Sequence, residues 1–166
     1  MIYFWLDAIA IAKRYVTEKG SSLIDHLFTQ VSTDRIICLF DSMDETRSVI
    51  VRYRNRGDIT PSDFNQVIQQ FEAEVINSTE VLQVHATINQ KVAARKYIED
   101  YSINSTDAYI LQCALDKANQ LRSDGDDLIF VSSDKKLVNA AKSERILTFN
   151  PKNASQAALD TLINVL

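Results

Sequence analysis

The strongest constraint on the fold is the alternation of short apolar runs with longer segments of helical periodicity. The apolar runs fall at residues 2–6, 35–40, 80–84, 128–131 and 146–149. Short runs of this kind are typical of buried strands. Helical patterns occupy residues 9–18, 22–31, 42–56, 60–76, 87–100, 105–121, 134–143 and 153–166. Strands that alternate with helices predict an α/β fold whose parallel sheet is covered by helices on both faces.

Length and composition narrow the class of protein further. A chain of 166 residues suits one domain over residues 1–166 with a single core. Three glycines and two prolines are too few for a turn-rich all-β fold or for disorder. No apolar run approaches the roughly 18–20 residues that cross a bilayer, and the N-terminus lacks the features of a signal peptide. We therefore expect a cytoplasmic protein without a membrane segment.

The cysteines, the histidines and the net charge argue against a disulfide, a zinc site and tight autonomous binding of nucleic acid. Cys38 and Cys113 lie in apolar segments and are predicted to be buried thiols rather than a disulfide. His26 and His85 lack ligand-like spacing, so a zinc site has little support. A net charge of −4 does not indicate a tight, autonomous binder of nucleic acid.

Positive charge is nevertheless concentrated locally. The basic residues near the acids described below are Lys13, Arg14, Arg47, Arg52, Arg54, Arg56, Lys135 and Lys136. Two interpretations stay open for them. They are either solvated helix faces or a basic rim that attracts a phosphate backbone.

Four carboxylates stand where an apolar element meets a polar junction. Asp7 and Asp134 follow predicted strands, and Glu45 and Asp107 open long helical patterns. In an open α/β sheet the carboxyl ends of the strands and the adjacent helix starts form one crevice. Four acids there would repel one another unless a cation neutralised them. The arrangement indicates a site for a hard metal ion and metal-assisted phosphoryl chemistry.

Helix capping is the alternative explanation for each of these acids. Asp7 and Asp134 can each cap the helix that follows. Asp107 can lie in the first turn behind a cap at residues 104–105, where its charge complements the helix dipole. The motif Ser42-x-x-Glu45 fits a capping box. Only the joint placement of the four acids at one sheet edge favours a common site.

The motifs around these acids resemble those of the PIN-domain family, in particular the small VapC-like toxin ribonucleases of type II toxin–antitoxin modules. The matching segments are Leu6–Val16 with Glu18-x-Gly20-Ser21, Glu45–Ser48 with Arg52 and Arg56-Gly57, Ser105–Ala108 with Cys113-Ala114-Leu115, and Phe130–Leu137 with Ala140-Ala141 and Asn150-Pro151. They cover nearly the whole chain in the order and spacing of that family.

The resemblance implies a PIN-like three-layer α/β/α fold with a central, mostly parallel sheet of about five strands. It implies an Mg²⁺- or Mn²⁺-dependent ribonuclease in which Asp7, Glu45 and Asp107 are catalytic metal ligands. Asp134 carries over as the fourth catalytic acid, which binds a second metal ion or acts through water. The resemblance also implies RNA as substrate, a homodimer and a cognate antitoxin.

Metal-activated water is the expected nucleophile of such an enzyme, attacking the phosphodiester in line. Lys13, Arg14 and Arg47 are candidate phosphate contacts. Ser132, which matches the family's small hydroxyl residue two positions before the fourth acid, is a further candidate substrate contact. One position departs from the family: Ile9 stands where Ser or Thr is usual after the first acid. Loss of that hydroxyl is expected to weaken or retune activity, because an outer-shell contact is commonly worth roughly 10–100-fold.

Two other functions are compatible with the same residues. The first is a catalytically weakened PIN-fold module that binds nucleic acid or protein, with Ile9 as its sign. The second is a doubly wound signalling domain whose acids accept a phosphoryl group. That second alternative leaves Glu45 unexplained.

Overall fold

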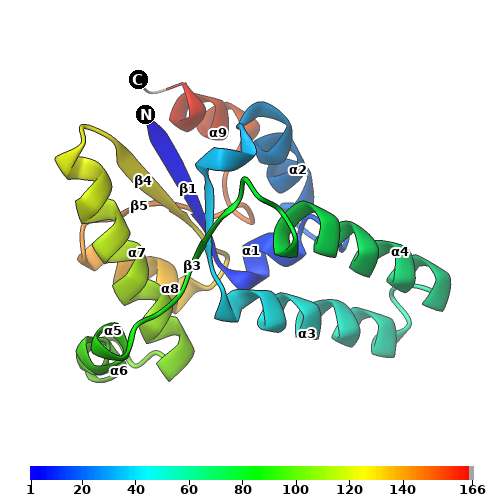
Figure 1. The fold of residues 1–166 in the computed structure, drawn as a ribbon. Coiled ribbons are helices and arrows are strands. Elements are labelled where there is room, and N and C mark those ends of the chain that lie inside the picture. The colour runs from blue at the N-terminus through cyan, green and yellow to red at the C-terminus, as the bar shows by residue number, and fades with distance from the viewer. Residues whose placement is uncertain (165–166) are drawn as a thin grey trace.

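Five parallel strands form one sheet in the order β3-β2-β1-β4-β5 in the computed structural model, which describes residues 1–164 (Figure 1). The strands are β1 Ile2–Leu6, β2 Ile36–Leu39, β3 Leu82–Val84, β4 Asp127–Val131 and β5 Leu147–Phe149. The chain runs outward from β1 through β2 to β3 and then returns to place β4 on the other side of β1. The sheet therefore has its topological switch point between β1 and β4.

Helices cover both faces of the sheet and form a three-layer α/β/α sandwich, which confirms the predicted fold class. The helices are α1 Ala8–Ala12, α2 Ser21–Gln30, α3 Asp41–Arg56, α4 Pro61–Phe71, α5 Ile88–Ala93, α6 Arg95–Tyr101, α7 Ser105–Ser123, α8 Lys135–Ser143 and α9 Gln156–Ile163. Side chains of a strand alternate between the two faces. Accordingly, Phe4 and Leu6 pack in a core with α1 to α4 and α9, and Trp5 packs in a second core with α6 to α8.

Several predicted elements differ in extent from the elements of the structure. The helix predicted over residues 9–18 ends at Ala12, because the chain turns there and the side chain of Lys13 is buried against Glu18. The helix predicted over residues 87–100 is divided at Ala94, which is both the C-cap of α5 and the residue before α6. The strand predicted over residues 80–84 is shortened to β3.

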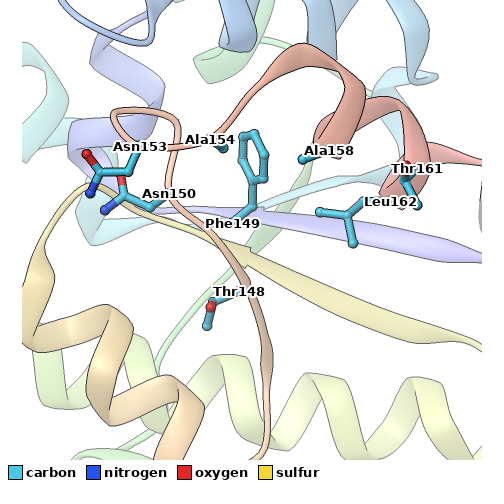
Figure 2. Close-up of a pocket in the computed structure, with 8 residues that line it drawn as sticks. All are labelled: Thr148, Phe149, Asn150, Asn153, Ala154, Ala158, Thr161 and Leu162. Carbon is cyan, nitrogen blue, oxygen red and sulfur yellow. The ribbon is translucent and has the colours of Figure 1, made fainter.

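The C-terminal helix packs beside α2 on the face of the sheet that α1 to α4 cover. Of the helix predicted over residues 153–166, α9 forms, and residues 165–166 lie outside the described part. A hollow of about 520 Å³ remains between β5 and α9. Figure 2 shows the ring of Phe149 pointing toward α9 between Ala154 and Ala158, with Asn150 and Asn153 side by side at the turn that follows β5.

Other predictions about the chain's environment can be compared with the structure. Cys38 and Cys113 are both buried free thiols, as predicted, and burial raises their pKa values to about 12 and about 11. No helix within residues 1–164 is long and apolar enough to cross a membrane.

One glycine is required for the turn after β5 to pack against the start of α2. Gly20 has a positive φ of 94°, and a Cβ atom there would lie 2.6 Å from the carbonyl oxygen of Pro151. Both a left-handed backbone and a close backbone approach therefore demand glycine.

Gly20→Ala is expected to lower the free energy of unfolding by about 3 kcal/mol, since left-handed strain of about 1–2 kcal/mol adds to the displacement of the Pro151 turn. Urea denaturation measures the change. Gly57→Ala is the matched control, because Gly57 has a φ of 80° but nothing within 4 Å of an added Cβ. The control should lose only about 1 kcal/mol, and equal losses in both variants would refute the close-approach explanation.

Candidate active site

Strand register brings the first two site residues together. In the β1–β4 pair Leu6 lies opposite Val131, so the residues that follow, Asp7 and Ser132, emerge side by side at the carboxyl end of the sheet. The backbone N–H of Asp7 donates to the carbonyl of Val131 at 3.2 Å and extends the ladder by one step. Asp7 is therefore fixed at the switch point, where α/β sheets characteristically bind ligands.

The side chain of Asp7 is almost completely buried and hydrogen-bonded. Its Oδ1 accepts a hydrogen bond of 2.7 Å from the backbone N–H of Ala10. Asp7 therefore caps α1, which was the alternative explanation for this acid. Its Oδ2 accepts a short hydrogen bond from the hydroxyl of Ser132. Only 3% of the residue is exposed. Capping and a place in the site are thus compatible at this position.

Ser132 links two of the four acids. Its hydroxyl donates to Asp7 and accepts a 3.0 Å hydrogen bond from the backbone N–H of Asp134. The side chain is fully buried. This placement does not fit the predicted contact between Ser132 and a substrate, because both sides of the hydroxyl are already occupied inside the protein. Ser132 instead orients Asp7 relative to the start of α8.

Glu45 lies in the second turn of α3, and its side chain is not used for capping. The helix begins at Asp41 behind Phe40, and no side chain caps it. Ser42 lies inside the helix and is buried, and its Oγ has no hydrogen-bond partner among the described residues. The capping-box interpretation of Ser42 and Glu45 is therefore wrong. The carboxylate of Glu45 is left to face the pocket described below.

The two remaining acids stand at the starts of α7 and α8. Asn104 caps α7 by accepting a 2.8 Å hydrogen bond from the backbone N–H of Asp107, and its amide donates to the Asp107 carboxylate at 2.7 Å. Asp134 caps α8 by accepting from the backbone N–H of Leu137 at 2.9 Å. In both cases the cap holds the carboxylate-bearing residue in place at the sheet edge.

All four acids line one small pocket of about 80 Å³. Its walls are Asp7, Ala8, Ile9, Glu45, Asn104, Asp107, Ile110 and Asp134. No basic side chain is among these wall residues, so the negative charge is not balanced within the pocket. Within residues 1–164, no three His, Cys, Asp or Glu side chains already stand in the arrangement of a finished metal site. The acids thus share a cavity without being gathered around one point.

Burial, together with a smaller contribution from neighbouring negative charge, raises the pKa values of two of the acids. Burial, opposed by the hydrogen bonds from Ser132 and Ala10, raises the pKa of Asp7 to about 7, and the charges of Glu45 and Asp107 add to the rise. Burial raises the pKa of Asp107 to about 6, with contributions from the charges of Asp134 and Glu45. The charges of two neighbouring acids therefore act on each of these two carboxylates, as expected for acids that share a pocket.

The predicted basic contacts lie elsewhere or are already paired. Lys13 is fully buried, and its Nζ lies 2.7 Å from Glu18, so it is not accessible to a substrate. Arg14 bonds Asp25 and Glu74, and Arg47 pairs with Glu72 at 2.6 Å. None of these three basic residues lines the acidic pocket.

Sequence reasoning missed one residue that positions the site. Thr46 is fully buried beside Glu45, and its hydroxyl donates to the carbonyls of Ser42 at 2.7 Å and Ala8 at 3.2 Å. It thereby ties the Glu45 helix to α1, next to Asp7. The signal available in the sequence was the position of Thr46 on the same helix face as Met43, Val49 and Ile50, which are buried.

The fold and this pocket define a parallel α/β protein with a carboxylate cluster at its switch point. The family model of the PIN domain matches residues 23–152, which is more than half of the chain. The chain belongs to the PIN-domain family. Glu45, Asp107 and Asp134 lie within the matched range, and Asp7 precedes it. Family membership also removes the alternative of a phosphoryl-accepting signalling domain.

Solved structures share this fold at low sequence identity. PAE2754 from Pyrobaculum aerophilum has a TM-score of 0.64 and 13% identity and covers 98% of each chain. FitAB bound to an IR36 DNA fragment has a TM-score of 0.63 and 12% identity over 92% of this chain and 97% of that chain. Mycobacterium tuberculosis VapC20, a toxin that cleaves the sarcin–ricin loop, has a TM-score of 0.58 and 13% identity over 82% and 94%. No curated protein matches the sequence.

Proposed function

We propose that this protein is a metal-dependent endoribonuclease that hydrolyses RNA phosphodiester bonds, and that it is the toxin of a toxin–antitoxin pair. The observation that carries this proposal is the pocket shared by Asp7, Glu45, Asp107 and Asp134 at the switch point of the sheet. Membership of the PIN-domain family supports it, as does the likeness in fold to VapC20, a sarcin–ricin loop cleaving toxin.

The donor set of the pocket fits a hard divalent cation. Four carboxylates offer only oxygen ligands, which Mg²⁺ and Mn²⁺ prefer. The raised pKa values of Asp7 and Asp107 reflect burial first and repulsion second, and a bound cation would stabilise the charged form of both carboxylates. Asp7, Glu45 and Asp107 would hold the ion, and Asp134 would hold a second ion or orient water. When bound, such an ion activates water and polarises the phosphoryl oxygen.

The protein's own residues prepare this site. Ser132 and the N–H of Ala10 hold both oxygens of Asp7, and Asn104 holds one oxygen of Asp107. These bonds fix the carboxylates on rigid elements rather than on loops. Asp134 is held by its hydrogen bond from the N–H of Leu137, and the partly exposed carboxylate of Glu45 faces the same pocket. Arg47, which is only partly buried beside Glu72, is the remaining predicted candidate for a phosphate contact.

Partners and location follow from the proposed role. We propose RNA as the substrate, a small antitoxin that covers the acidic pocket, a homodimer as the assembly and the cytoplasm as the compartment. A polypeptide that brings a basic side chain into the pocket would neutralise the four acids and exclude the metal ion. Inhibition that weakens with rising salt would accompany such a contact.

Cleavage of a structured RNA pool by the purified protein tests the proposed activity. We expect cleavage with Mg²⁺ or Mn²⁺ and none with EDTA. Asp107→Asn should abolish it, because a metal ligand is lost. Cleavage that survives both EDTA and this substitution would indicate a contaminating or metal-independent nuclease. A folded wild-type protein that binds RNA but cleaves none would support the alternative of a catalytically weakened binding module.

Ile9 offers a direct test of that alternative. Ile9 lines the acidic pocket and carries no hydroxyl. Ile9→Ser is expected to raise kcat/KM for RNA cleavage by about tenfold, since outer-shell contacts are worth roughly 10–100-fold. Ile9→Ala is the control, because it removes the same bulk without supplying a hydroxyl. Equal gains in both variants would show that pocket volume, and not the missing hydroxyl, limits activity.

A further inference from the structure

A second polar pocket lies directly beside the acidic one. It measures about 360 Å³ and is lined by Ser133, Lys135, Val138, Asn139, Lys142, Asn150, Lys152 and Asn153. Asp134 lines the acidic pocket, while its chain neighbours Ser133 and Lys135 line this one. The junction between β4 and α8 is therefore the wall that separates the two sites.

The charge of this lysine pocket is opposite to that of its neighbour. Three of its wall residues are lysines, and none is acidic. Lys135, Lys142 and Lys152 take part in no ion pair within residues 1–164. Unpaired cations that share one cavity repel each other and favour an anionic ligand. The lysine pocket is therefore a locally positive region on a chain whose net charge is −4.

Two structural elements face each other across the lysine pocket. Lys135, Asn139 and Lys142 follow the i, i+4, i+7 spacing of a single helix face on α8. The opposite wall is the turn after β5, which carries Lys152 and is held by a 2.9 Å hydrogen bond from the Lys152 N–H to the Asn150 side chain. The lysines are thus presented by a helix and a pinned turn.

The polar side of that turn also supplies amide groups. Figure 2 shows Asn150 and Asn153 side by side, directed away from the ring of Phe149 and α9. The Oγ of Ser133 is buried and has no hydrogen-bond partner among the described residues. A ligand with several acceptor oxygens would satisfy these amide and hydroxyl donors as well as the lysines.

We propose that the lysine pocket binds backbone phosphates of the RNA strand beside the phosphate that is cleaved. The inference rests on the proposed nuclease function, and it identifies where the strand runs: from the acidic pocket across the β4–α8 junction toward the turn after β5. A polyanion with one phosphate at the acids brings its next phosphates within reach of Lys135 first and then of Lys142 and Lys152. Lysine is suited to this role because it binds phosphate as a point charge without reading sequence.

The inference is tested by comparing how tightly two variants bind an RNA strand. Both variants lose two lysine charges, but only one of them loses these charges from the pocket. Lys142→Gln/Lys152→Gln removes two pocket cations, and Lys96→Gln/Lys117→Gln removes two lysine charges from α6 and α7. Both are made in an Asp107→Asn background, and fluorescence anisotropy reports the Kd of a single-stranded RNA of about twelve nucleotides. We expect the pocket variant to weaken binding about tenfold and to reduce the salt slope by about 1.4, at about 0.7 per phosphate contact. The control should change Kd less than twofold.

Replacing one phosphate linkage of the RNA distinguishes a backbone phosphate from free phosphate as the ligand of the pocket. A neutral methylphosphonate linkage within a few positions of the cleaved bond should weaken binding to the protein with intact lysines but not to the pocket variant. Lysine-dependent binding of inorganic phosphate or a mononucleotide, with strand affinity unchanged in the pocket variant, would overturn the assignment. So would lysine-dependent binding of an acidic peptide without any effect on RNA.

The binding readout keeps this inference separate from the proposed function. An active nuclease whose strand affinity does not respond to the pocket variant would disprove the lysine pocket and leave the nuclease intact. If the lysines contribute to RNA binding but the protein cleaves no RNA, the lysine pocket is supported and the proposed nuclease function is disproved.

Discussion

Asp7→Asn is expected to abolish RNA cleavage while leaving the metal-free protein at least as stable as the wild type. Cleavage should fall by about a thousandfold or more, because loss of outer-shell partners alone costs about 10–100-fold and Asp7 is a proposed ligand. Stability should not fall, because a neutral amide replaces a buried carboxylate whose pKa is raised to about 7. At pH 8 the wild type must keep that carboxylate charged, and its replacement should raise the free energy of unfolding by about 4 kcal/mol.

The local hydrogen bonds allow this separation of activity from stability. The asparagine oxygen can still accept from the N–H of Ala10, and its amide can donate to the hydroxyl of Ser132. Asp44→Asn is the control, because Asp44 is exposed in the first turn of α3 and outside the pocket. Urea denaturation in EDTA and a cleavage assay with Mn²⁺ measure the two effects. An Asp7→Asn protein that cleaves normally, or one that is less stable at pH 8, would contradict the assignment.

The acids at strand ends were predictable because an abrupt end of apolar character marks the end of a buried strand. Asp7 follows β1 directly, and Asp134 follows β4 after two serines. The boundary between apolar and polar residues therefore located both side chains at the sheet edge before any tertiary contact was known. Asp107 was located by a different pattern, the start of a helix, which the capping residue Asn104 marks.

The role of Glu45 depended on a contact that no local pattern contains. Ser42-x-x-Glu45 has the spacing of a capping box, but the N–H of Phe40 donates to the carbonyl of Val84 and extends the β2–β3 ladder past Leu39. That inter-strand bond fixes Phe40 as the residue before the helix, so α3 begins ahead of Ser42. The tertiary structure overrode a favourable local motif, and in doing so released Glu45 for the site.

Burial of polar residues could not be predicted from the sequence for the same reason. The register of β1 and β4 places Ser132 against Asp7, and register is a long-range property. Lys13 follows α1 on what looked like a continued helix face, but α1 ends at Ala12 and Glu18 comes back to meet it. Motif and composition indicated which residues could act, whereas packing decided which of them face the pocket.

Stability of the metal-free protein is expected to fall as the pH rises from about 5 to about 8. Asp7 and Asp107 have pKa values of about 7 and about 6 in the folded state, above the values near 4 of an unfolded chain. In this window the folded state binds more protons than the unfolded state, so the free energy of unfolding decreases with increasing pH. The contribution of the Asp7 and Asp107 carboxyl groups to stability is fully present below about pH 4 and is lost by about pH 8. Asp7 accounts for about 4 kcal/mol, and the more exposed Asp107 for less.

Divalent cations should reverse this loss only at high pH, because they compete with protons for the same carboxylates. At pH 8, Mg²⁺ or Mn²⁺ at about a hundred times its Kd should raise the free energy of unfolding by about 2.7 kcal/mol, and at pH 5 by much less. Urea denaturation across pH, with EDTA or metal, measures both effects. The Asp7→Asn/Asp107→Asn variant should show a flat pH profile and little response to metal. Stability that increases from pH 5 to pH 8 in EDTA would contradict the raised pKa values of Asp7 and Asp107. A metal effect equal at both pH values would show that these carboxylates do not form the metal-binding site.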